Sequence, residues 1–147
     1  MRRAEGEAIE AIRTMTGVDI SDHKAEDLQV IDSVLDADFR TTLQGRHEVE
    51  SASLGFGYFL AEVFVRNLGG RLHYPTWLQA VRALLSRDRS RAAERYCYIV
   101  LGDEKIFVFR AARESIEKTA DMFSLYEFYQ RYAHRNATDG TQHSRTE

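Results

Sequence analysis

Apolar residues recur every three or four positions along much of the chain, a spacing that predicts amphipathic helices. The first is expected over residues 4–15 and the second over 21–43, each followed by a glycine that would end it. A third is expected over 46–68. From Leu54 onward this helix is apolar on nearly every side, which is typical of the buried centre of a domain.

The second half of the chain adds the pattern of a small antiparallel sheet. Alternating side chains over 71–74 indicate an exposed strand, and a capping box then opens a helix over 77–86. Two β-rich runs, 95–101 and 105–109, are expected to pair as a hairpin. The basic stretch 86–95 is expected to be a polar loop.

The chain is expected to close with a short helix over 111–119 and a last helix opened by the capping box Ser124 to Glu127. The sequence therefore predicts one α+β domain over residues 1–135. In it, N-terminal helices pack on a small antiparallel sheet, with a C-terminal helix. Residues 136–147 are expected to form a flexible polar tail.

Composition agrees with a globular domain. The chain has 147 residues, of which 44% are hydrophobic and 29% charged. Its single cysteine, Cys97, cannot form an internal disulfide, and no apolar leader follows Met1. We therefore expect a cytoplasmic protein. The most hydrophobic stretch, 54–65, is too short to span a bilayer, so no membrane association is expected.

Charge is unevenly distributed. Residues 1–70 contain 7 basic and 13 acidic side chains, whereas residues 71–147 contain 13 and 10. Most of the acidic excess lies on the expected second helix, which is either a solvated face or a docking face for a basic protein. Asp32, Asp36 and Asp38 are the candidate binding residues of that face.

Three further residues are candidates for chemistry. Glu62 lies within the most apolar helix and is either partly buried or paired at the surface with Arg66. Cys97 is either a structural thiol or part of a site, and His73 on the exposed strand is able to line a pocket. A pocket between the central helix and the sheet would bring these three together.

No recognised catalytic or metal-binding motif occurs. The chain lacks a glycine-rich phosphate loop, a nucleophile elbow and the histidine or cysteine spacings of metal sites, so no cofactor and no metal are expected. The basic segment from Arg82 to Arg95 suits an anion, but it lacks interleaved aromatic residues. The sequence thus argues against a nucleic-acid partner and gives no specific reason to propose an enzyme.

Three segments carry a resemblance. They are Leu60–Val63 with its embedded Glu, Arg66–Arg71 with its Gly-Gly, and Ser124–Tyr129 with the pattern Ser-Leu-x-x-Phe-Tyr. Over roughly residues 50–132 the chain resembles a group of small bacterial α+β proteins, of which some are immunity proteins or adaptors. The resemblance implies a fold more than a function. The stretch Trp77–Arg95 departs from the pattern, because it is longer and more helical.

Together these features favour a protein-binding module, of the immunity type or the adaptor type, that occupies the surface of a partner protein. The alternative is a small-molecule-binding protein or enzyme with a pocket near Glu62, His73 and Cys97. The two differ in one structural requirement, because the alternative needs all three side chains to point into one cavity.

Overall fold

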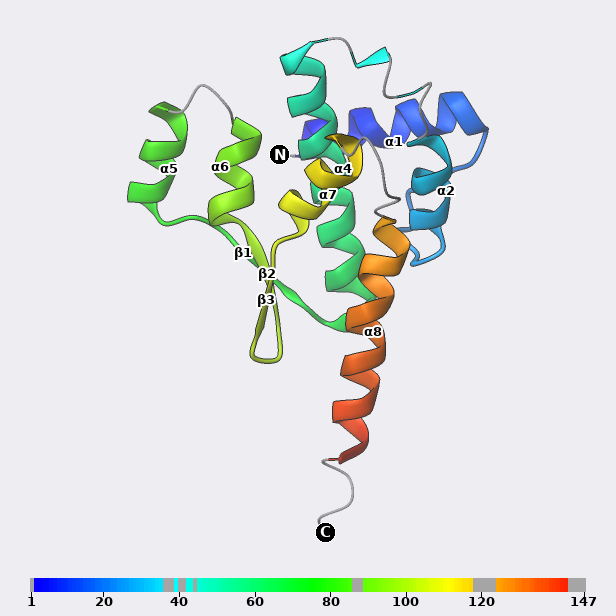
Figure 1. Cartoon of the computed structure of the whole chain (residues 1–147), viewed down its shortest axis with the longest axis vertical. Coiled ribbons are helices and arrows are strands. Elements are labelled where there is room, and N and C mark those ends of the chain that lie inside the picture. Colours follow the sequence, from blue (N-terminus) through cyan, green and yellow to red (C-terminus); the bar gives the residue numbers. More distant parts are fainter. Residues whose placement is uncertain are drawn as a thin grey trace.

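Two helices form the centre of the molecule. The computed structural model describes residues 2–35, 39, 42–43, 45–85, 89–117 and 124–142. Helix α4 (Arg46–Leu68) packs along α7 (Val108–Glu117), and the other elements surround this pair (Figure 1). Where the two helices meet, Gly57 faces the ring of Phe109, and a side chain at that position would collide with the ring. The apolar pattern of α4 is confirmed, because most residues between Gly55 and Phe64 are buried.

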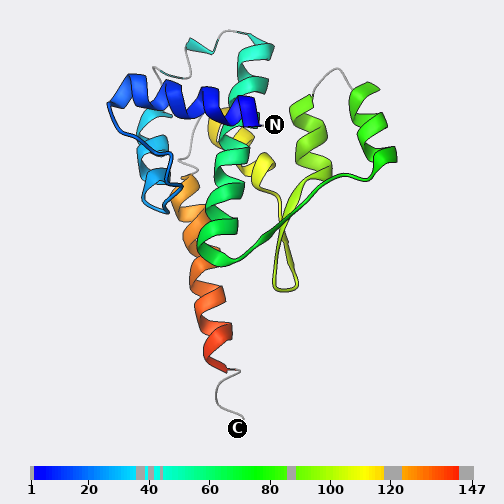
Figure 2. The same cartoon turned by 180° about the vertical axis from the view of Figure 1, so that it is seen from behind.

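The N-terminal helices cover one side of this centre (Figure 2). Helix α1 (Arg2–Thr16) crosses α4 at Gly55, where a Cβ atom would lie only 2.7 Å from the carbonyl oxygen of Ala4. Helix α2 (Asp27–Val34) instead packs against α8 (Leu125–Gln142). The core joins buried residues from both N-terminal helices to those of α4, α7 and α8.

The second helix begins later and ends earlier than the sequence predicted, because α2 runs from Asp27 to Val34 and Leu35 leaves the helical conformation. Side chains on either side of the preceding segment accept hydrogen bonds from its backbone amides: Asp19 from the amide of Ser21, and Asp27 from that of Lys24. Such local bonds offer the backbone an alternative to the helix, so turns form at residues 21–22 and 25–26 and α2 begins at Asp27.

Within the described part of the chain, the sheet has three antiparallel strands in the order β1-β2-β3. Their bounds are Arg71–His73, Tyr98–Leu101 and Glu104–Ile106. Gly69, with φ of 71°, ends α4 just before β1, and Gly102, with φ of 58°, turns the hairpin. The predicted α+β arrangement with a small antiparallel sheet and a C-terminal helix is confirmed.

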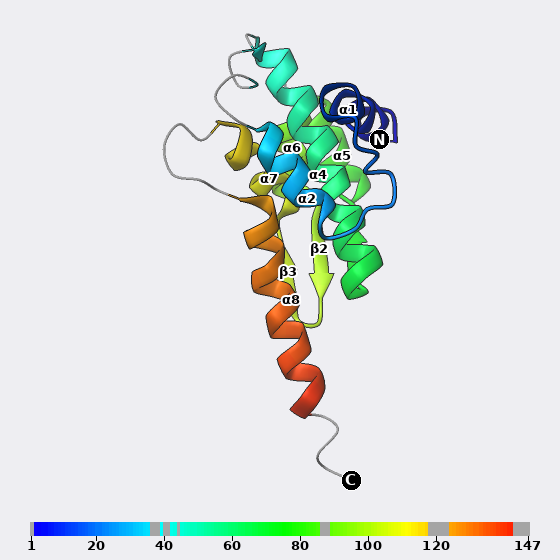
Figure 3. The same cartoon turned by 90° about the vertical axis from the view of Figure 1, so that its right-hand side faces the viewer.

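Other local predictions were also wrong. The second strand of the hairpin ends at Ile106 rather than at residue 109, because Val108 begins α7. The stretch expected to be a loop contains helix α6 (Arg89–Tyr96), because arginine, alanine and glutamate favour helix even without an apolar stripe. Cys97 lies between α6 and β2 rather than in the strand. Helix α8 does not end near Asn136 but continues to Gln142, projecting away from the body (Figure 3); residues 143–147 lie outside the described part.

Candidate interaction surface

Helix α5 (Trp77–Leu85) lies at the edge of the molecule. It packs against α6, which in turn contacts α4 and α7, so α6 separates α5 from the core (Figure 1). The predicted capping box opens the helix: the side chain of Gln79 accepts a hydrogen bond from the amide of Thr76 at 2.9 Å. The helix is therefore well formed locally, although it has little of the body to pack against.

One side of α5 is apolar and exposed. The exposed fractions are 73% for Trp77, 58% for Leu78, 44% for Val81 and 81% for Leu85. These four residues are called the α5 stripe below. At about 100° per residue they span roughly 100° of the helix circumference, so they form one continuous face. A contiguous apolar face of this kind, as opposed to scattered single residues, marks an interaction site.

The neighbouring helix cannot cover this face. Among the described side chains of α6, only Ala92 and Ala93 are buried, and both are small. Leu85, at the far end of α5, is the most exposed large hydrophobic residue described. Arg82 is also exposed and follows Val81 at the border of the stripe. The surface thus consists of an apolar ridge with a basic residue beside it.

Of the three acidic residues that the sequence predicted as a docking face, Asp32 alone lies within the described part of the chain. Asp32 lies on α2 and directs its carboxylate at the start of α8. It accepts hydrogen bonds from the hydroxyl of Ser124 at 2.7 Å and from the amides of Leu125 and Tyr126 at 2.8 and 3.0 Å. This carboxylate therefore has a structural use inside the chain. Asp36 and Asp38 lie outside the described residues, so their docking role stays a prediction.

The three residues predicted to line a small-molecule pocket have different surroundings in the structure. Glu62 pairs at the surface with Arg66, one helical turn later, at 3.3 Å. The imidazole of the exposed His73 stacks on Tyr98, with ring centroids 4.5 Å apart. Cys97 is buried, and burial raises the pKa of its thiol to about 11. A thiol with so high a pKa is a poor nucleophile near neutral pH.

Cys97 does line an open cavity of about 650 Å³ between α1, α4 and α6. Its lining residues within the described chain do not include Glu62 or His73. The hydroxyl of Tyr58 lies near Cys97, and burial, followed by the neighbouring thiol, raises the pKa of Tyr58 above its ordinary value. Both groups are therefore held in their neutral forms, which suits a packed wall better than acid or base catalysis.

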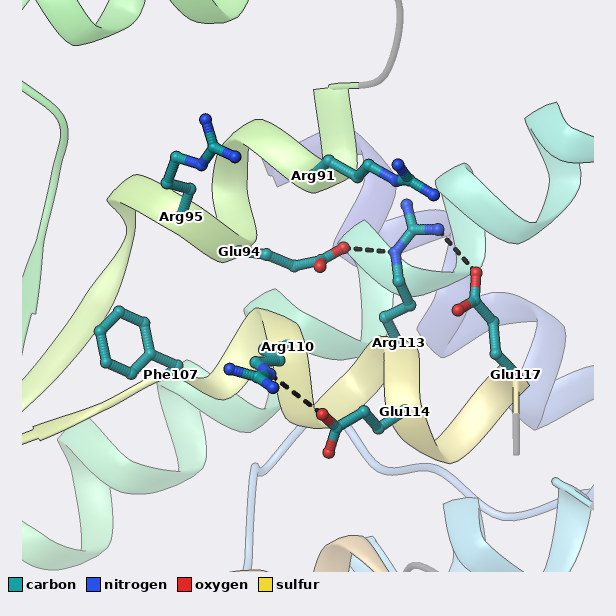
Figure 4. A pocket seen from close by; sticks show the side chains of 8 residues that line it. All are labelled: Arg91, Glu94, Arg95, Phe107, Arg110, Arg113, Glu114 and Glu117. Carbon is teal, nitrogen blue, oxygen red and sulfur yellow. Dashed lines mark hydrogen bonds and ion pairs between the residues drawn. The ribbon is translucent and has the colours of Figure 1, made fainter. Parts of the chain in front are cut away.

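A second cavity is built from charged residues of α6 and α7 (Figure 4). The side chain of Arg113 is almost buried and lies between Glu94 of α6 and Glu117, whose carboxylate accepts a hydrogen bond at 2.7 Å. Burial alone would lower the pKa of Arg113, but its hydrogen bonds to Glu117 and Glu94 outweigh it and raise that pKa. Arg110 is paired with Glu114 at 3.0 Å.

This arrangement changes the interpretation of the basic segment. Within the described part of the segment, Arg91 and Arg95 border the charged cavity, while Glu94 binds Arg113. The carboxylates in the wall neutralise much of the guanidinium charge that would attract an anion. The ion pair between Glu94 and Arg113 thus links α6 to α7. The cavity beside this pair is not a strongly positive anion site.

One buried histidine was missed as a structural element. His23 has φ of 56° and is 6% exposed. Its Nε2 lies 2.7 Å from Glu5 of α1, its ring stacks on Phe59 of α4, and its carbonyl accepts a hydrogen bond from Asn67. The histidine ties residues 17–26 to both helices. Its other ring nitrogen, Nδ1, is buried without a hydrogen-bond partner among the described residues.

Neither a metal site among the described residues nor a related protein adds a further candidate for the function. The described residues contain no cluster of three or more histidine, cysteine or carboxylate side chains that would hold a metal ion. None of their helices combines the length and apolarity needed to cross a membrane. Comparisons with protein-family models, curated proteins and solved structures gave no match to this chain. The resemblance to small bacterial proteins therefore stays a prediction.

Proposed function

We propose that this chain is a protein-binding module, of the immunity type or the adaptor type, and that the α5 stripe is its contact surface. The observation that carries the proposal is the exposure of Trp77 and Leu85, at 73% and 81%, on one face of a peripheral helix. Tryptophan is among the residues most enriched at the few positions that contribute most of an interface's binding energy, and apolar neighbours around it exclude water. We place the module in the cytoplasm, where its single cysteine stays reduced.

The position of α5 supports this role. The helix contacts α6 rather than the core, so a partner is able to bury the stripe without disturbing α4 or α7. Helices with exposed apolar faces commonly dock against other helices or in grooves. The candidates for chemistry support it too, because Glu62 and His73 are engaged at the surface and Cys97 has a raised pKa.

The experiment is a capture from native lysate with tagged full-length protein, read by mass spectrometry. Wild type is compared with Leu85→Asp, which places a charge on the α5 stripe, and with Met15→Asp as the matched control. Met15 is an exposed apolar residue of α1, at 52%. We expect a stoichiometric partner that binds wild type and Met15→Asp but not Leu85→Asp. A partner retained equally by all three would overturn the assignment of the surface.

A further inference from the structure

We propose that, without another partner, the α5 stripe is covered by a second copy of this chain, with two α5 helices packed antiparallel about a two-fold axis. This inference rests on the proposed function, since it takes the same surface to be a protein contact. Two-fold dimers are the commonest soluble oligomers, and they require a patch that is complementary to itself. The α5 stripe meets that requirement in size, charge and shape.

The area is sufficient for a weak dimer. At their exposed fractions, the four side chains of the stripe offer on the order of 500 Å² of accessible surface per copy. A pair of copies would then bury about 1,000 Å², which is the lower limit for a specific interface, before any contact at the rim. We therefore expect a reversible dimer with a dissociation constant in the micromolar range.

Charge does not oppose the pairing. Trp77, Leu78, Val81 and Leu85 are all uncharged, so no like charges would meet along the seam. The charged residue of the helix, Arg82, borders the stripe and would lie at the edge of the interface, where it stays in water. The seam therefore has the apolar centre and polar rim of a protein interface.

The order of side-chain sizes also suits a two-fold axis. Trp77, Val81 and Leu85 follow one another at intervals of four residues and form a single ridge on α5. The smallest of the three is in the middle. If the axis passes beside Val81, the two helices approach closely at the centre, and Trp77 of each copy packs beside Leu85 of the other. Ridge-into-groove packing of helices favours this alternation of large and small residues.

The test measures the mass of the full-length chain in solution as its concentration rises from the low to the high micromolar range, by sedimentation or light scattering. Wild type is expected to pass from the mass of one chain to that of two. The emission of Trp77, the single tryptophan of the chain, is expected to shift to shorter wavelength over the same range. Leu85→Asp should stay a monomer, whereas Met15→Asp should dimerise as wild type does.

Either of two results would overturn the proposal: wild type that stays monomeric at every concentration, or a dimer that persists unchanged in Leu85→Asp. Leu85 is 81% exposed, so its substitution should not unfold the chain, and circular dichroism checks this. Failure of the dimer is distinguishable from failure of the proposed function. If wild type stays monomeric but loses its lysate partner in Leu85→Asp, the contact surface stands and only the second copy is excluded as its occupant. If Leu85→Asp retains the lysate partner, the proposed function itself fails.

Discussion

The carboxylate of Asp32 accepts a hydrogen bond of 2.8 Å from the backbone amide of Leu125, although the two residues lie 93 positions apart in the sequence. Through the hydroxyl of Ser124 and the amide of Tyr126 the same carboxylate closes the first turn of α8. Free amides at a helix start need acceptors, and a negative charge there also favours the helix dipole. Asp32 therefore fastens α2 to the C-terminal helix.

Replacing Asp32 with Ala is expected to destabilise the fold by about 1–3 kcal/mol, because it removes a helix cap and leaves part-buried donors without an acceptor. Urea unfolding followed by circular dichroism measures the loss. Asp22→Ala is the matched control, since Asp22 is 70% exposed and pairs with Lys24 at the surface. Equal stability of the two variants would show that the cap contributes nothing to the free energy of unfolding.

The contact between α6 and α7 depends on Arg113, whose side chain is 10% exposed between Glu94 and Glu117. Replacing Glu94 with Gln removes the less exposed of the two carboxylates that pair with this guanidinium. We expect the free energy of unfolding to fall by about 2–3 kcal/mol. The control is Glu114→Gln, because Glu114 forms an exposed pair with Arg110 and should contribute less than about 0.5 kcal/mol. Thermal and chemical unfolding of both variants would decide the matter, and comparable losses would contradict a buried role for Glu94.

The crossing of α1 over α4 depends on the absence of a side chain at Gly55. A Cβ there would lie 2.7 Å from the carbonyl oxygen of Ala4, so Gly55→Ala should cost about 1–3 kcal/mol by forcing the helices apart. Gly6→Ala is the contrasting substitution. Gly6 is exposed on α1 with open space around it, and alanine there should stabilise by up to about 1 kcal/mol. Opposite signs in unfolding experiments are the expected result, and a stabilising Gly55→Ala would refute the close crossing.

Burial of Cys97 should make the free energy of unfolding depend on pH. Its pKa is about 11 in the folded chain, because burial disfavours the thiolate, whereas the unperturbed value is 9.0. A group whose pKa is higher in the folded state favours folding fully below the unfolded value, and this contribution is lost as pH rises from about 9 through 11. Free energies of unfolding should thus fall over that window more steeply for wild type than for Cys97→Ala.

Labelling gives a second readout of the same thiol. Iodoacetamide reacts with the thiolate, so at about pH 8 the folded chain should be alkylated at least a hundredfold more slowly than the chain in urea. Parallel stability profiles for wild type and Cys97→Ala, together with equal labelling rates in the presence and absence of urea, would mean that the thiol is not buried.

The elements that the sequence predicted well are those whose local pattern is complete in itself. Helix α4 combines helical spacing with apolar residues on nearly all sides, and Gly69 supplies the left-handed residue that ends it. The hairpin and the capping boxes at Thr76 and Ser124 are equally local. Helix α6 was missed because, without an apolar stripe, only its helix propensity marks it.

The candidate surface could not be predicted in the same way. The spacing of Trp77, Val81 and Leu85 shows that α5 has an apolar face, but it does not show what covers that face. One signal was available in the sequence: the segment that follows, Arg89–Tyr96, has only Ala92, Ala93 and Tyr96 as apolar residues to pack against that face. The role of Asp32 was beyond local reasoning, because its hydrogen-bond partners on α8 come from the other end of the sequence.

The most direct measurement is acrylamide quenching of the fluorescence of Trp77 in the full-length chain, diluted until it is monomeric. Trp77 is the only tryptophan, so the signal reports the α5 stripe alone. With 73% of its surface exposed, it should emit at long wavelength and be quenched almost as readily as tryptophan in the urea-unfolded chain. Emission at short wavelength with strong protection in the folded monomer would mean that the stripe is covered by the chain itself, and the proposed contact surface would not exist.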